Sequence, residues 1–191
     1  IAYNIVRRSY HRAKWCNPCY SLIMPVTING NGTVTGLTAL PDSAMSSGSV
    51  IQVVFGSTTS EVSNTSGNYV DSGVTATITP SSTSNKIMVI ASIQWWLYRE
   101  ATETNGSFKL LRDSTAISTH EDAIHIEAGT TGQSRIISEG GYTIQALDSP
   151  NTTSATTYKV QFKTNITANG GQVRVSRSSA PSCITLMEVA G

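Results

Sequence analysis

Apolar and polar residues alternate along most of this chain. Val74, Ala76 and Ile78 alternate with threonines, and the same alternation recurs over residues 158–163 and 173–175. Successive side chains of a β-strand point to opposite faces, so this pattern predicts strands with one buried face and one wet face. The chain is therefore predicted to be an all-β protein of antiparallel sheets.

Two segments depart from this rule because they are apolar on both faces. They are residues 87–98 and 183–190. A long strand with two apolar faces is either the central strand of a sandwich or a strand that another subunit covers. Trp95 and Trp96 fall on opposite faces of the first segment. This predicts Trp95 in the core and Trp96 at a subunit interface.

Clusters of Gly, Pro, Asn and Ser separate the apolar runs and predict turns. These clusters lie at residues 66–68, 79–81, 105–107, 140–141, 149–151 and 169–171. About eight strands result, at the spacing of an antiparallel β-sandwich or jelly roll. Apart from the N-terminal arm, only residues 119–128 have a pattern with helical character.

The chain divides into three predicted parts. Residues 1–23 form a basic N-terminal arm, residues 24–48 an attachment hairpin and linker, and residues 49–191 a β-sandwich head. The hairpin is too small to hold a core of its own, so we expect a partner chain to stabilise it. The pair Met24-Pro25 fits an initiation site, in which case the arm lies outside the mature protein.

Composition and charge narrow the range of partners. Serine and threonine make up 51 of the 191 residues, whereas only 13% are charged, against about 25% in an ordinary globular domain. The arm carries a charge of +4 and the remainder −3, which together give the net +1. No interleaved basic and aromatic face accompanies the arm, and no stretch approaches the roughly 20 apolar residues of a membrane span. We therefore predict neither nucleic-acid binding nor membrane insertion.

Motifs for catalysis or metal binding are sparse. Cys16 and Cys19 form a lone C-x-x-C pair without the second pair that a zinc site requires. His125 and Glu127 would share one face of an extended strand and could bind a metal, but the segment reads equally well as an exposed connection. Nucleophile-elbow and phosphate-loop motifs are absent from the sequence. We predict no enzyme activity, no catalytic or metal-binding residues and no cofactor, with residues 120–127 as the only basis for an alternative hydrolase.

Aromatic residues near the end of the first two-faced segment offer one candidate contact site. Trp96, Tyr98 and Arg99 are predicted to contact another subunit or a ligand, because aromatic side chains bury large areas and keep a polar edge. A carbohydrate-binding module of the same fold is the alternative hypothesis.

Several separated motifs, in order along residues 24–191, resemble tailed-bacteriophage fibre and virion-surface proteins, notably those of aquatic phages. The motifs are Met24–Gly30 (MPVTING), Asn68–Val89 (NYVDSGVTATITPSSTSNKIMV), Leu111–Thr115 (LRDST) and Ser182–Gly191 (SCITLMEVAG). Residues 1–23 match nothing in this pattern.

This resemblance implies a non-enzymatic structural protein at the virion surface, in a tail fibre, a head fibre or a capsid decoration. It implies a jelly-roll or TNF/C1q-like head on a short attachment segment, usually assembled as a homotrimer. The expected partners are other copies of the chain, other virion proteins that contact the N-terminal segment, and a host surface glycan or receptor.

Overall fold

The computed structural model describes residues 27–28, 34–35, 45–101, 103–127 and 135–191, and the chain divides into two units, residues 1–40 and 41–191. In the first unit, β1 (Thr27–Ile28) pairs antiparallel with β2 (Val34–Thr35), within the segment predicted as an attachment hairpin and linker. The basic arm of residues 1–23 lies outside the described residues.

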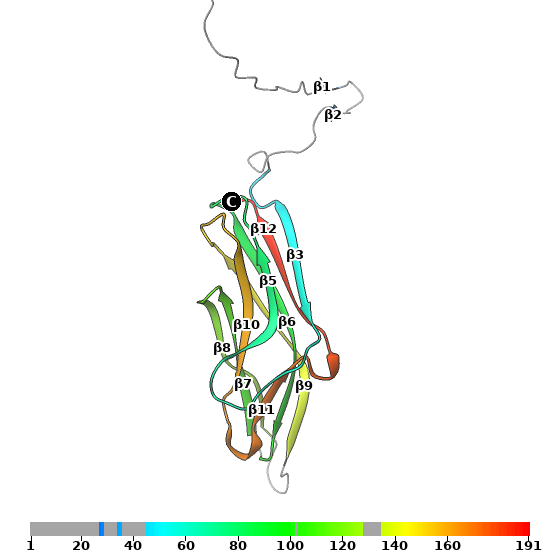
Figure 1. Cartoon of the computed structure of the whole chain (residues 1–191), viewed down its shortest axis with the longest axis vertical. Coiled ribbons are helices and arrows are strands. Elements are labelled where there is room, and N and C mark those ends of the chain that lie inside the picture. Colours follow the sequence, from blue (N-terminus) through cyan, green and yellow to red (C-terminus); the bar gives the residue numbers. More distant parts are fainter. Residues whose placement is uncertain (1–26, 29–33, 36–44, 102, 128–134) are drawn as a thin grey trace, which may run out of the picture. The chain divides into compact units, whose positions relative to one another are not determined.

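The second unit consists of strands that form two antiparallel sheets (Figure 1). The strands are β3 (Val50–Thr58), β4 (Val62–Asn64), β5 (Val70–Ile78), β6 (Lys86–Arg99), β7 (Glu103–Arg112), β8 (Thr115–Glu127), β9 (Ile136–Asp148), β10 (Thr156–Thr164), β11 (Gln172–Val175) and β12 (Ser182–Val189). The described residues also hold two short 3-10 segments, η2 (Ala168–Gly170) and η3 (Arg177–Ser179), and no α-helix. The predicted all-β sandwich is thereby confirmed.

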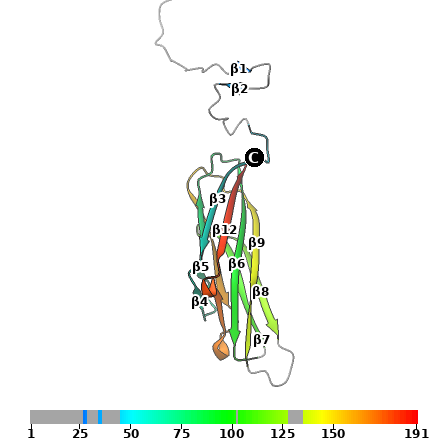
Figure 2. The same cartoon turned by 90° about the vertical axis from the view of Figure 1, so that its right-hand side faces the viewer.

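The order of strands in the two sheets is that of a jelly roll. One sheet, here called the β6 sheet, has the order β3-β12-β6-β9, which Figure 2 shows face on, and β11 and β4 continue it beside the second half of β6. The other, here called the β7 sheet, has the order β5-β10-β7-β8. Chain-neighbouring strands such as β5 and β6 thus alternate between the sheets, as in a double Greek key.

The core lies between the two sheets and follows the predicted alternation. Strand β5 alternates buried and exposed residues from Ser72 to Ile78, and β10 alternates buried and half-buried residues along its whole length. The two-faced segment of residues 87–98 is β6, which has strands on both edges and is therefore central in its sheet. The fully buried large side chains include Tyr158, Phe108, Phe162, Ile87, Ile93, Leu97, Ile144, Ile184 and Leu186.

A polar contact joins the two sheets at the edge of this core. Asp148 on β9 accepts hydrogen bonds from Arg112 Nη1 at 2.8 Å and from the Tyr158 hydroxyl at 2.7 Å. Tyr158 is fully buried, so its hydroxyl requires such a partner. Burial and the neighbouring Asp148 both raise the pKa of the Tyr158 phenol, which keeps it a neutral donor.

A buried carboxylate holds the end of β12 to the turn between β5 and β6. Glu188 is fully buried and accepts four hydrogen bonds of 2.5–2.7 Å from Gln52 Nε2, Asn85 Nδ2 and the backbone and hydroxyl of Ser81. Burial by itself raises the pKa of Glu188, but the hydrogen bonds from Asn85, Gln52 and Ser81 outweigh it and hold the pKa below its ordinary value. The carboxylate is therefore a structural anion.

Two of the predicted turns are wrong, because their glycines lie inside strands. Residues 105–107 are in β7 and residues 140–141 are in β9. A larger residue at either position would clash with a neighbouring side chain. A Cβ at Gly106 would lie 2.7 Å from Val173 Cγ2, and a Cβ at Gly140 would lie 2.8 Å from Trp95 Cζ2. The predicted helical character of residues 119–128 is not found, because β8 extends to Glu127.

Candidate functional site

The second half of β6 places the predicted contact residues on its outer face. Trp96 and Tyr98 point outward, and their rings stack with centroids 5.6 Å apart and an interplanar angle of 5°. Trp95 points the other way and packs against the core, as predicted. The side chain of Trp96 is only 7% exposed, because residues of its own chain cover it.

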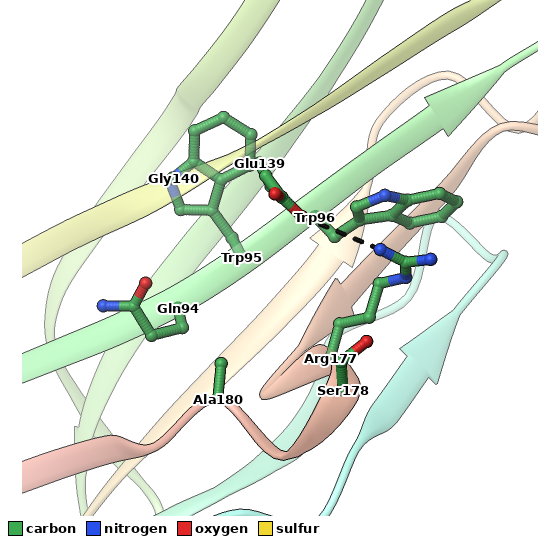
Figure 3. Close-up of a pocket in the computed structure, with 8 residues that line it drawn as sticks. All are labelled: Gln94, Trp95, Trp96, Glu139, Gly140, Arg177, Ser178 and Ala180. Atoms are coloured by element: carbon green, nitrogen blue, oxygen red, sulfur yellow. Dashed lines mark ion pairs between the residues drawn. The ribbon is translucent and has the colours of Figure 1, made fainter.

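Two arginines supply most of that cover. Arg174 on β11 lies directly across from Trp96 in the sheet, and its guanidinium is 4.8 Å from the indole centroid. Arg177 on η3 reaches the same ring at 4.7 Å (Figure 3). A cation over an indole face is attracted by the ring quadrupole. We call Trp96, Tyr98, Arg174 and Arg177 the Trp96 cluster.

Carboxylates balance both guanidinium groups. Arg174 forms an ion pair with Glu61 at 2.9 Å, and Arg177 forms one with Glu139 at 3.7 Å, the dashed line in Figure 3. Each arginine thus has a carboxylate partner. Together with Glu61 and Glu139, the cluster has no net charge that would select an anionic or a cationic ligand.

Arg99, the third predicted residue, is not part of this cluster. Its side chain donates hydrogen bonds to the carbonyl oxygens of Ala168 at 3.1 Å and Glu103 at 2.5 Å. These contacts hold the connection between β10 and β11 to the end of β6. The structure thus brings Trp96 and Tyr98 together and gives Arg99 a separate, bridging position.

A pocket of about 440 Å³ opens beside the Trp96 cluster. It is lined by Gln94, Trp95, Trp96, Glu139, Gly140, Arg177, Ser178 and Ala180. Ser176, Ser178 and Ser179 all adopt left-handed backbone conformations, with φ of 56°, 55° and 62°. Such conformations cost free energy in residues other than glycine, and here they hold Arg177 over Trp96.

The segment 120–127 lies in β8, but its side chains do not converge. His120 Nδ1 lies 3.0 Å from the Tyr142 hydroxyl, whereas His125 Nε2 lies 3.2 Å from Glu103 Oε1. Across the described ranges, no group of three or more His, Cys, Asp or Glu is placed to hold a metal ion. The same part of the chain contains no helix of sufficient length and apolarity to cross a membrane.

Glu121 belongs instead to a charged network on the outer face of the β7 sheet. It accepts hydrogen bonds from the Tyr69 hydroxyl at 2.9 Å and from Ser107 at 2.9 Å, and pairs with Lys163 at 2.9 Å. Lys163 and Ser107 lower the pKa of Glu121 to about 2. Burial and Glu121 raise the pKa of Tyr69 to about 12. This face is charged and hydrated.

The outer face of the β6 sheet has the opposite character near the start of β3. Three adjacent rows run across β3, β12, β6 and β9: Val53–Met187–Met88–Leu147, Phe55–Thr185–Ile90–Gln145 and Ser57–Cys183–Ser92–Thr143. We call these rows the apolar face. Phe55, Val53 and Leu147 are 63%, 59% and 54% exposed. The sequence indicated Met88, Ile90 and Met187 as part of a second apolar face. It did not indicate the residues on β3 and β9, because the pairing of those strands brings them beside this face.

No protein-family model matches the chain, and no curated protein matches it. Among solved structures, the chain is similar to one of infectious bursal disease virus Gx strain, at 13% identity and a TM-score of 0.33, and to the VP2 subviral particle of the same virus, at 14% and 0.34. Each match covers 75% of this chain and 39% of the other, so this chain spans well under half of their length. A Bacillus endospore appendage, from a family of disulfide-linked pili, is similar at 12% identity and a TM-score of 0.27, over 81% of this chain and 100% of that one. Likenesses this low assign no family.

Proposed function

We propose that this chain is a non-enzymatic structural component of a bacteriophage virion, displayed at the particle surface and assembled as a homotrimer. The jelly roll is the displayed head, and the N-terminal segment contacts other virion proteins. In this role the head is a building block of a fibre or a capsid decoration that takes part in host attachment.

The observation that supports this proposal is the unequal exterior of the sandwich. One outer face carries charged networks such as Lys159–Asp71 at 2.8 Å and Lys163–Glu121 at 2.9 Å, whereas the apolar face carries Val53, Phe55 and Met88. A subunit of an assembly needs both kinds of face, because one contacts water and the other contacts a neighbour. The resemblance of residues 24–191 to phage surface proteins agrees with this role.

The test is the location of the chain in particles purified from the phage that encodes it. We expect mass spectrometry to detect the chain as a stoichiometric component, and antibodies against the head to label intact particles. A chain that is abundant in the infected cell but absent from gradient-purified particles would contradict the proposal.

The pocket beside the Trp96 cluster favours a second candidate function, which is glycan binding. Gln94, Glu139, Arg177 and Ser178 offer hydrogen-bonding groups around one opening, as a hydroxyl-rich ligand requires. The Trp96 ring is covered, so a sugar would rely on polar contacts and on the half-buried Tyr98.

A glycan array probed with the full chain tests this second function. We expect Arg177→Ala to weaken any specific glycan signal by about tenfold, which corresponds to the loss of one good polar contact. Lys159→Ala, on the outer face of the other sheet, is the matched control and should leave the signal unchanged. An array without specific signal, or equal losses in both variants, would eliminate this candidate.

A further inference from the structure

We infer that the apolar face is the surface through which this chain packs against a second copy of itself. The inference rests on the proposed self-assembly and deepens it by naming the contact surface and its central residues. Three observations support it: the exposure of the face, its lack of charge, and the distribution of large and small side chains over it.

The exposed apolar side chains of the head are concentrated on one sheet. All five large apolar residues that are at least half exposed in the described ranges lie on β3 or β9, which are edge strands of the β6 sheet. They are Val50, Val53, Phe55, Ile137 and Leu147. Val53, Phe55 and Leu147 lie in the rows of the apolar face, whereas Ile137 lies at the other end of β9, across from Tyr98. Contiguous exposed apolar surface such as these rows usually marks an interaction site, whereas isolated exposed residues do not.

The absence of charge on this face favours a second copy over a different partner. None of the positions in its three rows is Asp, Glu, Lys or Arg. Charged groups first occur beyond the rows, at Lys86 on one side and at Arg174 and Glu139 on the other. A neighbouring copy can therefore pack against this face without meeting a like charge on it. A face without charge also offers nothing that selects a partner of opposite sign.

The face is large enough for the central part of a subunit contact. Strands lie about 4.8 Å apart and residues on one face of a strand repeat about every 6.8 Å, so three rows over four strands cover roughly 400 Å². A standard interface takes about 800 Å² from each partner, with an apolar centre and a polar rim. The three rows thus supply about half of such an area, and residues around them supply the remainder.

The distribution of side-chain size leaves space for side chains of a neighbouring copy. The rows that contain Phe55 and Met88 are large, and the next row consists of Ser57, Cys183, Ser92 and Thr143. Protruding side chains of the neighbouring copy can fill the space above this small row, as side chains interdigitate between packed sheets. In a homotrimer the neighbour contributes a different surface, because a closed three-fold ring is built from heterologous contacts.

The experiment measures the mass of the full chain in solution, by light scattering during gel filtration at micromolar concentration. We expect the wild type at a multiple of the 20.3 kDa chain mass, three-fold for a homotrimer. Phe55→Asp and Leu147→Asp should each weaken association by about 30-fold or more, because each places a charge in an apolar contact that excludes water. Both side chains point outward, so the monomer should keep the wild-type circular dichroism spectrum.

Thr77→Asp is the matched control, since it adds the same charge on the exposed face of β5, an edge strand of the other sheet. It should leave the mass unchanged. Cys183 gives a second readout in a Cys16→Ser, Cys19→Ser background: its thiol should be protected from a maleimide in the wild type and reactive in Phe55→Asp.

A wild-type monomer with a reactive Cys183, or a Phe55→Asp variant with the wild-type mass, would overturn the inference. The proposed function fails by a different result, the absence of the chain from purified particles. A chain that associates through this face but is missing from particles would therefore contradict the virion role and keep the contact surface.

Discussion

Replacement of Glu188 by glutamine is expected to lower the free energy of unfolding by about 3 kcal/mol at pH 7. The carboxylate is surrounded by four N–H and O–H donors, which are Gln52 Nε2, Asn85 Nδ2, and the backbone N–H and the hydroxyl of Ser81. A glutamine amide presents an NH₂ group to part of this donor set, which leaves buried donors unpaired. Urea denaturation followed by tryptophan fluorescence measures the loss.

The pH dependence of this loss has a definite sign. The hydrogen bonds from Asn85, Gln52 and Ser81 stabilise the ionised form despite the burial, so the folded-state pKa of Glu188 lies below the unfolded one. Ionisation therefore contributes stability that is fully present above the unfolded pKa, about 4.3, and is lost as the pH falls through the folded pKa. The difference between wild type and Glu188→Gln should shrink as the pH is lowered below about 4.

Glu139→Gln is the control, because Glu139 is exposed on the same sheet, with 73% of its side chain in solvent. Its effect on the unfolding free energy should stay within about 0.5 kcal/mol at every pH. An equal loss in Glu188→Gln at pH 7 and at pH 3 would contradict the account, since the wild-type advantage would then not come from the ionised carboxylate.

The architecture was predictable from the sequence because strand periodicity is a local property. Alternation over residues 74–78 and 158–163 identifies strands whatever they pair with, and the structure confirms the inward set in both. The two-faced pattern of residues 87–98 correctly indicated a central strand.

The errors come from residues whose role depends on a distant neighbour. Gly140 resembles a turn residue until Trp95, 45 positions earlier in the chain, lies across from it in the sheet. The apolar face was visible only on β6 and β12, since Phe55 and Leu147 join it through pairings that a sequence does not display. Long-range register is a tertiary property, so periodicity alone does not reveal a surface made of four strands.

Several residues of the phage-like motifs make contacts that hold this fold together. Ser81 and Asn85 belong to one motif and Glu188 to another, and the structure joins them through hydrogen bonds to the buried Glu188 carboxylate. Arg112, in a third motif, binds Asp148 and so ties the two sheets together. These motif residues therefore stabilise the sandwich. A resemblance based on these residues therefore indicates the architecture more than the ligand or the host.

Gly56→Ala is expected to lower the free energy of unfolding by about 3 kcal/mol, at the upper end of overpacking effects. Gly56 lies on β3 and faces β5, where the two sheets meet at one side of the sandwich. An added Cβ would lie 2.2 Å from the carbonyl oxygen of Thr75 and 3.2 Å from Ala76 Cβ. Backbone cannot rotate away as a side chain can, so β3 would have to separate from β5.

Gly141→Ala is the matched control for this effect. Gly141 also lies inside an edge strand, β9, but its added Cβ would meet only Gln94 Nε2, at 3.5 Å. That contact is an ordinary one, so this variant should stay within about 0.5 kcal/mol of the wild type or gain slightly from the reduced freedom of the unfolded chain. The urea midpoint compares the two variants directly. Equal midpoints would mean that β3 moves without cost, and the sandwich would then not be closed by the approach of Gly56 to β5.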